Sequence, residues 1–265
     1  MVTFRDLVSA FRKLDLDHHP VIVHAAMSSL DEVRGGAESL LGALLTVQPA
    51  VMMPCFTYQT MIVPETGPEH NGIQYGSAHD RNHTAEFFRK RLPADPEMGA
   101  LAEALRNHPR AERSLHPLLS FCGIGVDEAL EEQTLSEPLA PIGALTRAGG
   151  WVLLLGVDHT RNTSIHSAER LAGRKTFTRW ALTTDGVREC PNIPGCAQGF
   201  NALEPYLAAI TRTATAGSSQ LRALPLQPMI QVICDLLAAD RTAFLCSDPG
   251  CERCAETRAA ALTPN

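Results

Sequence analysis

Apolar residues recur along the chain in two spacings, one typical of helices and one typical of buried strands. Helical spacing, with apolar positions three or four residues apart, predicts helices at 3–14, 35–46, 85–92, 98–109, 126–134, 201–213 and 228–239. Continuous apolar runs with flanking glycine, proline or polar residues predict strands at 21–24, 50–56, 118–124, 151–157 and 242–246. The alternating segment 175–190, with its Thr-Asp-Gly turn, predicts a β-hairpin.

The order of these elements favours an α/β fold. The first two strands and the helix between them form a strand-helix-strand unit, which implies a parallel pair. We therefore expect a mixed, partly parallel central sheet covered by helices, with inserted helical and loop elements, in a single domain spanning residues 1–265. Residues 57–85 show no periodicity, and a stretch of that length is typical of a functional loop or lid.

Charge and apolar content narrow the class of partner. The 265 residues carry a net charge of −6 and no long basic run, which argues against nucleic acid and against an anionic membrane surface. The N-terminal segment has helical spacing without the apolar core of a signal peptide, and no run of about 18 apolar residues occurs. We expect a cytoplasmic enzyme, monomeric or homodimeric, that acts on small molecules.

Eight cysteines are present, and most lie inside apolar runs typical of core positions. The segment CSDPGCERC is different, because it brings Cys246, Cys251 and Cys254 within reach of one ion. Zinc prefers four ligands, and the fourth would come from elsewhere, for example Cys190 or Cys196. The expectation is free thiols, with a structural zinc as the alternative.

Two candidate anion sites lie near predicted strand ends, where ligands bind in open α/β sheets. Gly35-Gly36 opens a helix, so backbone N–H groups there could contact a phosphate, although a plain turn explains the pair equally well. The segment RSLHPLLSF, residues 113–121, combines arginine, serine and histidine suited to phosphate or carboxylate, or it is an ordinary loop.

The segment GVDHTRNTSIHSAE, residues 156–169, carries the strongest chemical signal. Ser164 or Thr163 can cap the helix that follows the strand at 151–157, which explains part of the pattern. Helix capping does not explain why His166 and Glu169 lie at that strand end. Histidine is the side chain best suited to act as a base near neutral pH, so His166 is the candidate catalytic residue.

Taken together, these pieces resemble the aminoglycoside 3-N-acetyltransferase family, which is unrelated to the GNAT acetyltransferases. The resemblance runs from about residue 20 to residue 240. It rests on VIVHAAM, Gly35-Gly36-Ala37, the PCFT strand end, RSLHPLLSF, PLAPIGAL at 138–145 and VLLLGVDHTRNTSIHSAE. The N-T-S-I-H-S-A-E run after a buried strand is the most specific of these.

The resemblance implies transfer of an acetyl group from acetyl-CoA to the 3-amino group of an aminoglycoside, directly within a ternary complex. It assigns His166 as the general base and Glu189, on the strand after the hairpin turn, as the carboxylate that orients it; Glu169 is the second choice. An acyl-enzyme route through Cys55 or Cys122 is the mechanistic alternative. The implied CoA-contacting residues are His24, Ala25, Met27, Ser28, Ser29, Gly35, Gly36, Ser114, His116 and Ser120. The implied aminoglycoside-contacting residues are Asp80, Asp158, Glu169 and Trp180.

The sequence also departs from the family pattern. His24-Ala25-Ala26-Met27 stands where the family has His-Ser-Ser-Leu, and CSDPGCERC is not a general family feature. Three other functions remain open: a hydrolase using Ser164 or Ser167, although no G-x-S-x-G motif is present; a zinc-stabilised binding module; and an acyltransferase of the same family acting on a different, biosynthetic amine.

Overall fold

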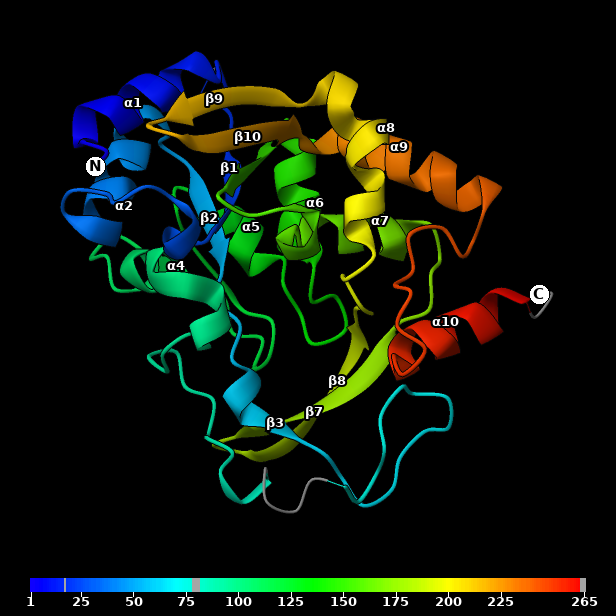
Figure 1. The fold of residues 1–265 in the computed structure, drawn as a ribbon. Coiled ribbons are helices and arrows are strands. Elements are labelled where there is room, and N and C mark those ends of the chain that lie inside the picture. Colours follow the sequence, from blue (N-terminus) through cyan, green and yellow to red (C-terminus); the bar gives the residue numbers. More distant parts are fainter. Residues whose placement is uncertain (17, 78–81, 263–265) are drawn as a thin grey trace.

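The structure, a computed structural model describing residues 1–16, 18–77 and 82–262, contains two sheets (Figure 1). In the seven-stranded sheet, β1 (Val21–Ala25) pairs in parallel with β2 (Val51–Pro54) and with β6 (Trp151–Leu155), and the other pairs are antiparallel. The mixed, partly parallel sheet and the parallel pair predicted from the sequence are confirmed. The strand order is β4 (Glu112–Arg113), β5 (Phe121–Ile124), β2 (Val51–Pro54), β1 (Val21–Ala25), β6 (Trp151–Leu155), β10 (Ser219–Pro225) and β9 (Arg212–Ala216).

Helices cover both faces of this sheet because successive strand residues point to opposite sides. In β1, Val21 and Val23 belong to one core cluster and Ile22 to the other. Each such fully buried aliphatic side chain contributes about 1.5–3 kcal/mol to stability. The first face is covered by α1 (Phe4–Lys13), α2 (Gly36–Val47) and α4 (Gly99–Arg106). The second is covered by α5 (Asp127–Glu131), α6 (Ala140–Arg147), α7 (Ser164–Leu171), α8 (Glu204–Leu207) and α9 (Leu226–Ala239).

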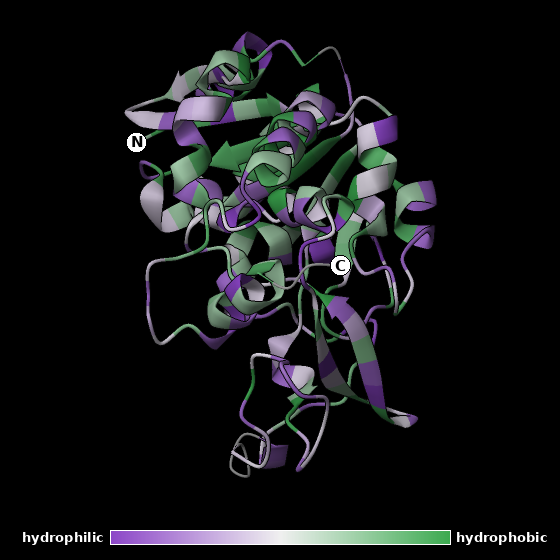
Figure 2. Cartoon of the chain, turned by 90° about the vertical axis from the view of Figure 1, so that its right-hand side faces the viewer, coloured by the Kyte–Doolittle hydropathy of each residue, from purple (hydrophilic) through white to green (hydrophobic). Residues whose placement is uncertain are grey.

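The smaller sheet lies beyond the C-terminal ends of the parallel strands (Figure 1). Its three antiparallel strands are β3 (Met61–Ile62), β7 (Phe177–Thr183) and β8 (Gly186–Ile193), in that order. β7 and β8 form the predicted hairpin, with Thr183 opposite Gly186 at the turn. Figure 2 shows hydrophobic residues concentrated in the large sheet, whereas the hairpin carries more hydrophilic ones. The C-terminal helix α10 (Glu252–Leu262) completes the described chain.

Two predicted elements are wrong. Residues 85–92 form no helix, because Phe88 instead donates its backbone N–H to Leu182 O at 2.9 Å beside β7. Residues 242–246 form a turn rather than a strand: Asp240 accepts from the backbone N–H of Thr242 at 2.7 Å, and Phe244 adopts a left-handed φ of 46°. The hairpin of β9 and β10 and the helices α6 and α10 were not predicted.

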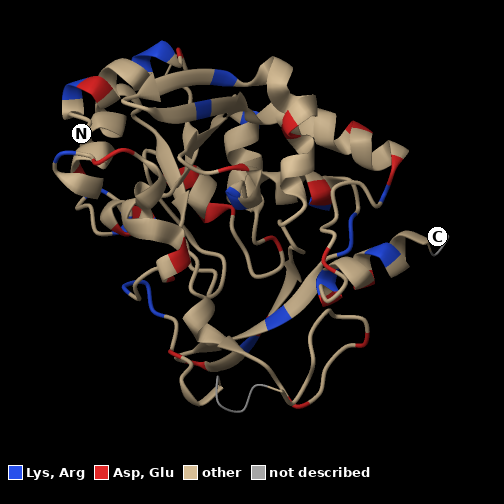
Figure 3. Cartoon of the chain, in the orientation of Figure 1, with Lys and Arg blue, Asp and Glu red and all other residues tan. Residues whose placement is uncertain are grey.

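Figure 3 shows acidic and basic residues spread over helices and loops without a single basic face in that view. Across the described part of the chain, no helix has the length and apolar content needed to cross a membrane.

Candidate active site

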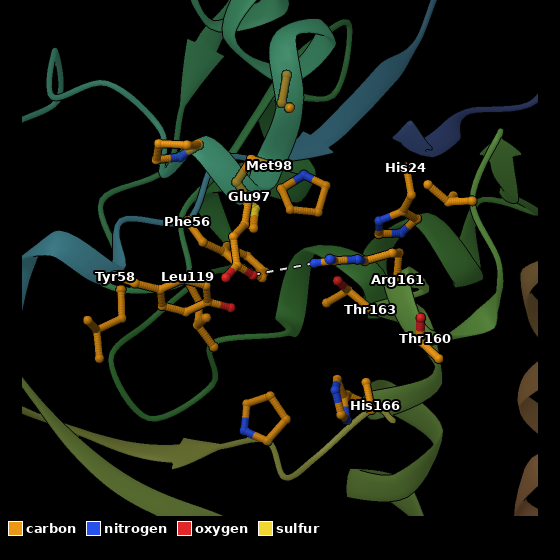
Figure 4. A pocket seen from close by; sticks show the side chains of 18 of the residues that line it. His24, Phe56, Tyr58, Glu97, Met98, Leu119, Thr160, Arg161, Thr163 and His166 are labelled. Atoms are coloured by element: carbon orange, nitrogen blue, oxygen red, sulfur yellow. Dashed lines mark hydrogen bonds and ion pairs between the residues drawn. The ribbon is translucent and has the colours of Figure 1, made fainter. Parts of the chain in front are cut away.

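A cavity of about 1050 Å³ lies between the two sheets at the C-terminal ends of β1 and β6. Both sheets contribute to its wall, together with the 3₁₀ helices η1 (Met27–Ser29), η3 (Pro96–Met98) and η4 (His159–Arg161). Its size suits a drug-sized molecule together with part of a second one. The lining side chains drawn in Figure 4 include His24, Tyr58, Glu97, Met98, Arg161 and His166.

A strand end, a glycine turn and a 3₁₀ helix together position His166 in the wall of this cavity. β6 ends at Leu155, and Gly156, with a φ of 68°, turns the backbone. Asp158 caps η4 by accepting from the backbone N–H of Thr160, and α7 then begins at Ser164. His166 is therefore in the first turn of α7, 8% exposed, with its ring facing the cavity (Figure 4). Phe200 packs against that ring, with the centroids 4.8 Å apart.

Behind His166, two buried charged groups continue the hydrogen-bond chain. His166 Nδ1 lies 2.5 Å from Glu169 Oε2, and Arg174 Nη1 donates to Glu169 Oε1 at 2.7 Å. Arg174 Nη2 donates in turn to the carbonyl oxygens of Arg241 and Ala243 at 2.9 and 2.7 Å. Removing Arg174 would leave the buried carboxylate of Glu169 without its cationic partner, which typically costs about 3–5 kcal/mol, whereas removing His166 leaves that ion pair in place.

The protonation state of Glu169 decides what His166 can do. Burial acts to raise the pKa of Glu169, but the charge and hydrogen bonds of His166 and Arg174 outweigh it and hold the pKa below its usual value. An ionised carboxylate can only accept, so His166 Nδ1 carries a proton toward it. In the neutral ring the other nitrogen, Nε2, presents a lone pair and can accept a proton from a molecule in the cavity; the protonated ring carries the charge that lowers the pKa of Glu169.

Glu169, rather than Glu189, lies against His166. Glu189 is on β8, exposed to solvent and paired across the hairpin with Trp180. The spacing of Glu169, three residues after His166 on one helix, was the signal that could have placed it first. Arg174 was missed, because nothing in the sequence shows that it folds back from the end of α7 onto Glu169.

The proposed CoA-contacting residues divide into two groups, and the first lies on the cavity wall. It consists of His24, Ala25, Met27 and Ser28, at the end of β1 and in η1. Burial lowers the pKa of His24 to about 3, and its Nε2 has no hydrogen-bond partner among the described residues. His24 is therefore a neutral ring at neutral pH.

The second group lies outside the residues that line the cavity, and its members shape the surrounding backbone. Ser114 and Ser120 are buried and bonded to neighbouring backbone groups. His116 Nδ1 accepts from the backbone N–H groups of Leu118 and Leu119, at 3.1 and 3.0 Å, and burial lowers its pKa to about 4. This turn presents both leucines to the cavity. The group also includes Ser29, Gly35 and Gly36.

None of the described residues that the sequence suggested for aminoglycoside contact lines the cavity. Asp158 is engaged in capping η4, and Glu169 lies behind His166. Trp180 packs edge-on against Tyr75, with the ring centroids 6.0 Å apart, and neither aromatic residue lines the cavity. Asp80 lies outside the described residues.

The charged groups on the wall are mostly basic, which the sequence did not reveal. Glu97 and Arg161 form an ion pair of 3.4 Å across the cavity (Figure 4). Arg179 and Arg253 lie on the side of the smaller sheet, and burial lowers the pKa of Arg179 to about 10, which still leaves it charged at neutral pH. Among the described lining residues, three arginines thus accompany the single carboxylate of Glu97.

The family model described as aminoglycoside 3-N-acetyltransferase matches residues 22–238. A similar curated protein is the SPbeta prophage-derived aminoglycoside N(3')-acetyltransferase-like protein YokD of Bacillus subtilis, 31% identical over 178 residues. The match covers 63% of this chain and 65% of that protein, so the chain spans just under two thirds of this relative's length.

Solved structures show the same fold. The apoenzyme of the aminoglycoside acetyltransferase AAC(3)-IVa superposes with a TM-score of 0.78 at 22% identity, over 98% of each chain. AAC-IIIb, solved as a binary complex with CoASH, superposes with a TM-score of 0.71 at 21% identity, over 89% of this chain and 96% of the other. At these identities the likeness concerns the fold.

Proposed function

This chain belongs to the aminoglycoside 3-N-acetyltransferase family, and from that premise we propose that it transfers the acetyl group of acetyl-CoA to the 3-amino group of an aminoglycoside. The observation that carries the proposal is the hydrogen-bonded series of His166, Glu169 and Arg174, in which His166 faces the cavity and the other two lie behind it. It supplies a base whose tautomer is held by a buried carboxylate, as acyl transfer to an amine requires.

The chemistry assigns each of these residues a role. An alkylammonium has no lone pair, so the acceptor attacks as the free amine, its first proton having passed to solvent. His166 Nε2 removes a second proton from the nitrogen as the bond to the thioester carbonyl forms. The tetrahedral intermediate then collapses, the C–S bond breaks, and the leaving CoA thiolate takes the proton from the imidazolium. Glu169 stabilises that imidazolium without taking its proton, and Arg174 keeps Glu169 ionised and in place.

CoA would enter along the wall formed by His24, Ala25, Met27 and Ser28. The small side chains of Ala25 and Ser28 leave room there for a pantetheine arm. The developing oxyanion needs backbone N–H donors, for which we propose Met27 and Ser28 at the start of η1. The fold neighbour AAC-IIIb, crystallised with CoASH, supports a CoA site in this fold.

A thiol-release assay with acetyl-CoA against a panel of aminoglycosides tests this function. The expected result is CoASH release with a subset of the panel and a product acetylated at N3 by NMR. A chain that binds CoA but acetylates no member of the panel would overturn the aminoglycoside as the acceptor.

A different acceptor amine is the second candidate, and the charge of the cavity favours it. Aminoglycosides are polycations, which bind best to walls rich in carboxylates. Arg179 and Arg253 instead suit an amine that also carries a carboxylate or phosphate group. The same assay with small amino acids and aminoalkylphosphonates separates the two, because turnover of these probes without turnover of aminoglycosides assigns the anionic class.

A further inference from the structure

Four cysteines from two segments of the chain meet at one side of the cavity. Cys196 comes from the loop after β8, and Cys246, Cys251 and Cys254 come from the segment leading into α10 and its first turn. Their sulfur atoms all lie within 4.8 Å of one another, and Cys246 Sγ is 3.3 Å from Cys254 Sγ. We call these four residues the cysteine corner.

This spacing is that of a tetrahedral tetrathiolate site. With zinc-sulfur bonds of about 2.3 Å, the sulfurs of a regular tetrahedron lie about 3.8 Å apart. The C-x₄-C-x₂-C segment supplies three of the ligands, and Cys196 supplies the fourth. Cys190, the other candidate for the fourth ligand, is buried elsewhere on β8 and is not part of the group.

The packing around α10 points independently to an ion. This helix of 11 residues buries only two side chains, those of Cys254 and Thr257. The small core that joins it to the rest of the chain consists of cysteine sulfurs with one leucine, Leu245, packed against them. An isolated helix this short is marginal in water, and one buried thiol and one hydroxyl supply little apolar area to hold it.

Polar groups around the cysteine corner suit a site with net negative charge. Four thiolates and one divalent cation sum to −2. The backbone N–H of Gln198 donates to Cys196 Sγ at 3.4 Å. Arg258 donates to the carbonyl oxygen of Cys246, and Arg253 donates to that of Gly195 at 3.1 Å. Both guanidinium groups are thereby held beside the sulfur cluster.

We propose that Cys196, Cys246, Cys251 and Cys254 bind a structural zinc ion that clamps α10 to the loop of residues 194–198. Binding replaces four thiol protons with the metal, and the protons leave to solvent. Cys196, Gln198 and Arg253 also line the cavity, so the ion holds one part of its wall. The site depends on no particular acceptor or reaction, and it replaces the free thiols expected from the sequence.

Metal analysis of the full chain, purified without chelator, tests the site. We expect about one zinc ion per chain, and we expect the cobalt-substituted protein to show the ligand-field and charge-transfer bands of a tetrahedral tetrathiolate. Cys251→Ser should lose the ion and these bands. Cys234→Ser is the matched control, since this half-buried free cysteine lies outside the cysteine corner. Metal-free protein with four reactive thiols, or with a Cys246–Cys254 disulfide, would overturn the proposal.

The clamping role has its own test on the wild-type chain, which avoids variants that fail to fold. Zinc is released with a mercurial reagent, and amide hydrogen exchange is compared before and after. Exchange should rise at residues 194–198 and 246–262 and stay unchanged in β6. An unchanged exchange pattern at α10 after complete release of zinc would show that the ion does not hold this helix.

Discussion

The cavity has two supporting corners that are built in opposite ways. The catalytic corner, made of His166, Glu169 and Arg174, lies within nine consecutive residues and rests on the helix-covered core of the large sheet. The cysteine corner joins Cys196 to a cysteine-rich segment that begins 50 positions later, at Cys246, and it has almost no apolar core of its own. One corner is held by burial and ion pairs, and the other by the metal ion that we propose.

This difference predicts which property of the protein changes when each corner is damaged. Damage to the catalytic corner should lower turnover while leaving the fold and the metal in place. Damage to the cysteine corner should loosen one wall of the cavity while leaving the His166–Glu169 contact intact. Phe200 connects the two, because it packs against both His166 and Phe244, which precedes Cys246 by two residues.

The largest effect is expected from His166→Ala. Loss of the general base should lower kcat by about 10²–10⁴-fold while CoA affinity, measured by calorimetry, stays near the wild-type value. His19→Ala is the matched control, since His19 is exposed near the opposite end of β1. Wild-type turnover in His166→Ala would remove the proposed base and with it the catalytic corner.

A smaller loss is expected from Glu169→Gln, because the base remains but its tautomer is no longer imposed. We expect kcat to fall more than tenfold but less than in His166→Ala. The double variant should be no slower than His166→Ala alone, since the two residues act as one unit. Additive losses in steady-state kinetics would show that Glu169 acts independently of His166.

Gly199→Ala tests the connection between the corners. A Cβ at Gly199 would come within 2.2 Å of Phe244 O and 2.7 Å of Leu245 C. Both are backbone atoms, so relieving the clash requires a shift of the main chain. We expect a stability loss of about 3 kcal/mol in urea unfolding and faster release of zinc to a chelator. Gly173→Ala is a poor control because of its left-handed φ, whereas Gly143→Ala is suitable, since its Cβ would meet Arg147 Nη1 at 3.5 Å, an ordinary contact. An unchanged rate of zinc release in Gly199→Ala would show that packing around Phe200 and Phe244 does not affect the cysteine corner.

The smallest effect concerns His24, which faces the same cavity as His166 but whose Nε2 has no hydrogen-bond partner among the described residues. Its pKa of about 3 in the fold lies below that of an unfolded histidine, so its contribution to stability is lost as pH falls below about 6.5. Between pH 7 and pH 5, wild type should lose about 2 kcal/mol more unfolding free energy than His24→Asn. Equal losses in the two proteins would mean that His24 titrates freely in the fold.

Much of the fold could be predicted from the sequence because its signals are local. The parallel strands at 21–25 and 51–54, the strand at 151–155 and the hairpin at 177–193 are apolar or alternating runs with clear turns. The helix predicted at 85–92 failed because a backbone pairing with β7, distant in sequence, outweighs local spacing there. The hairpin of β9 and β10 was missed because its outer strand is half exposed and polar.

The sequence by itself determined the family and the fold class, and NTSIHSAE placed the proposed base His166 and Glu169 on one helix turn after a buried strand. Only the tertiary structure decided which carboxylate meets His166, which arginines line the cavity and which cysteine completes the cysteine corner. The physical reason is sequence distance. A helix fixes the relation between residues three or four apart, whereas contacts between distant segments depend on how whole elements pack.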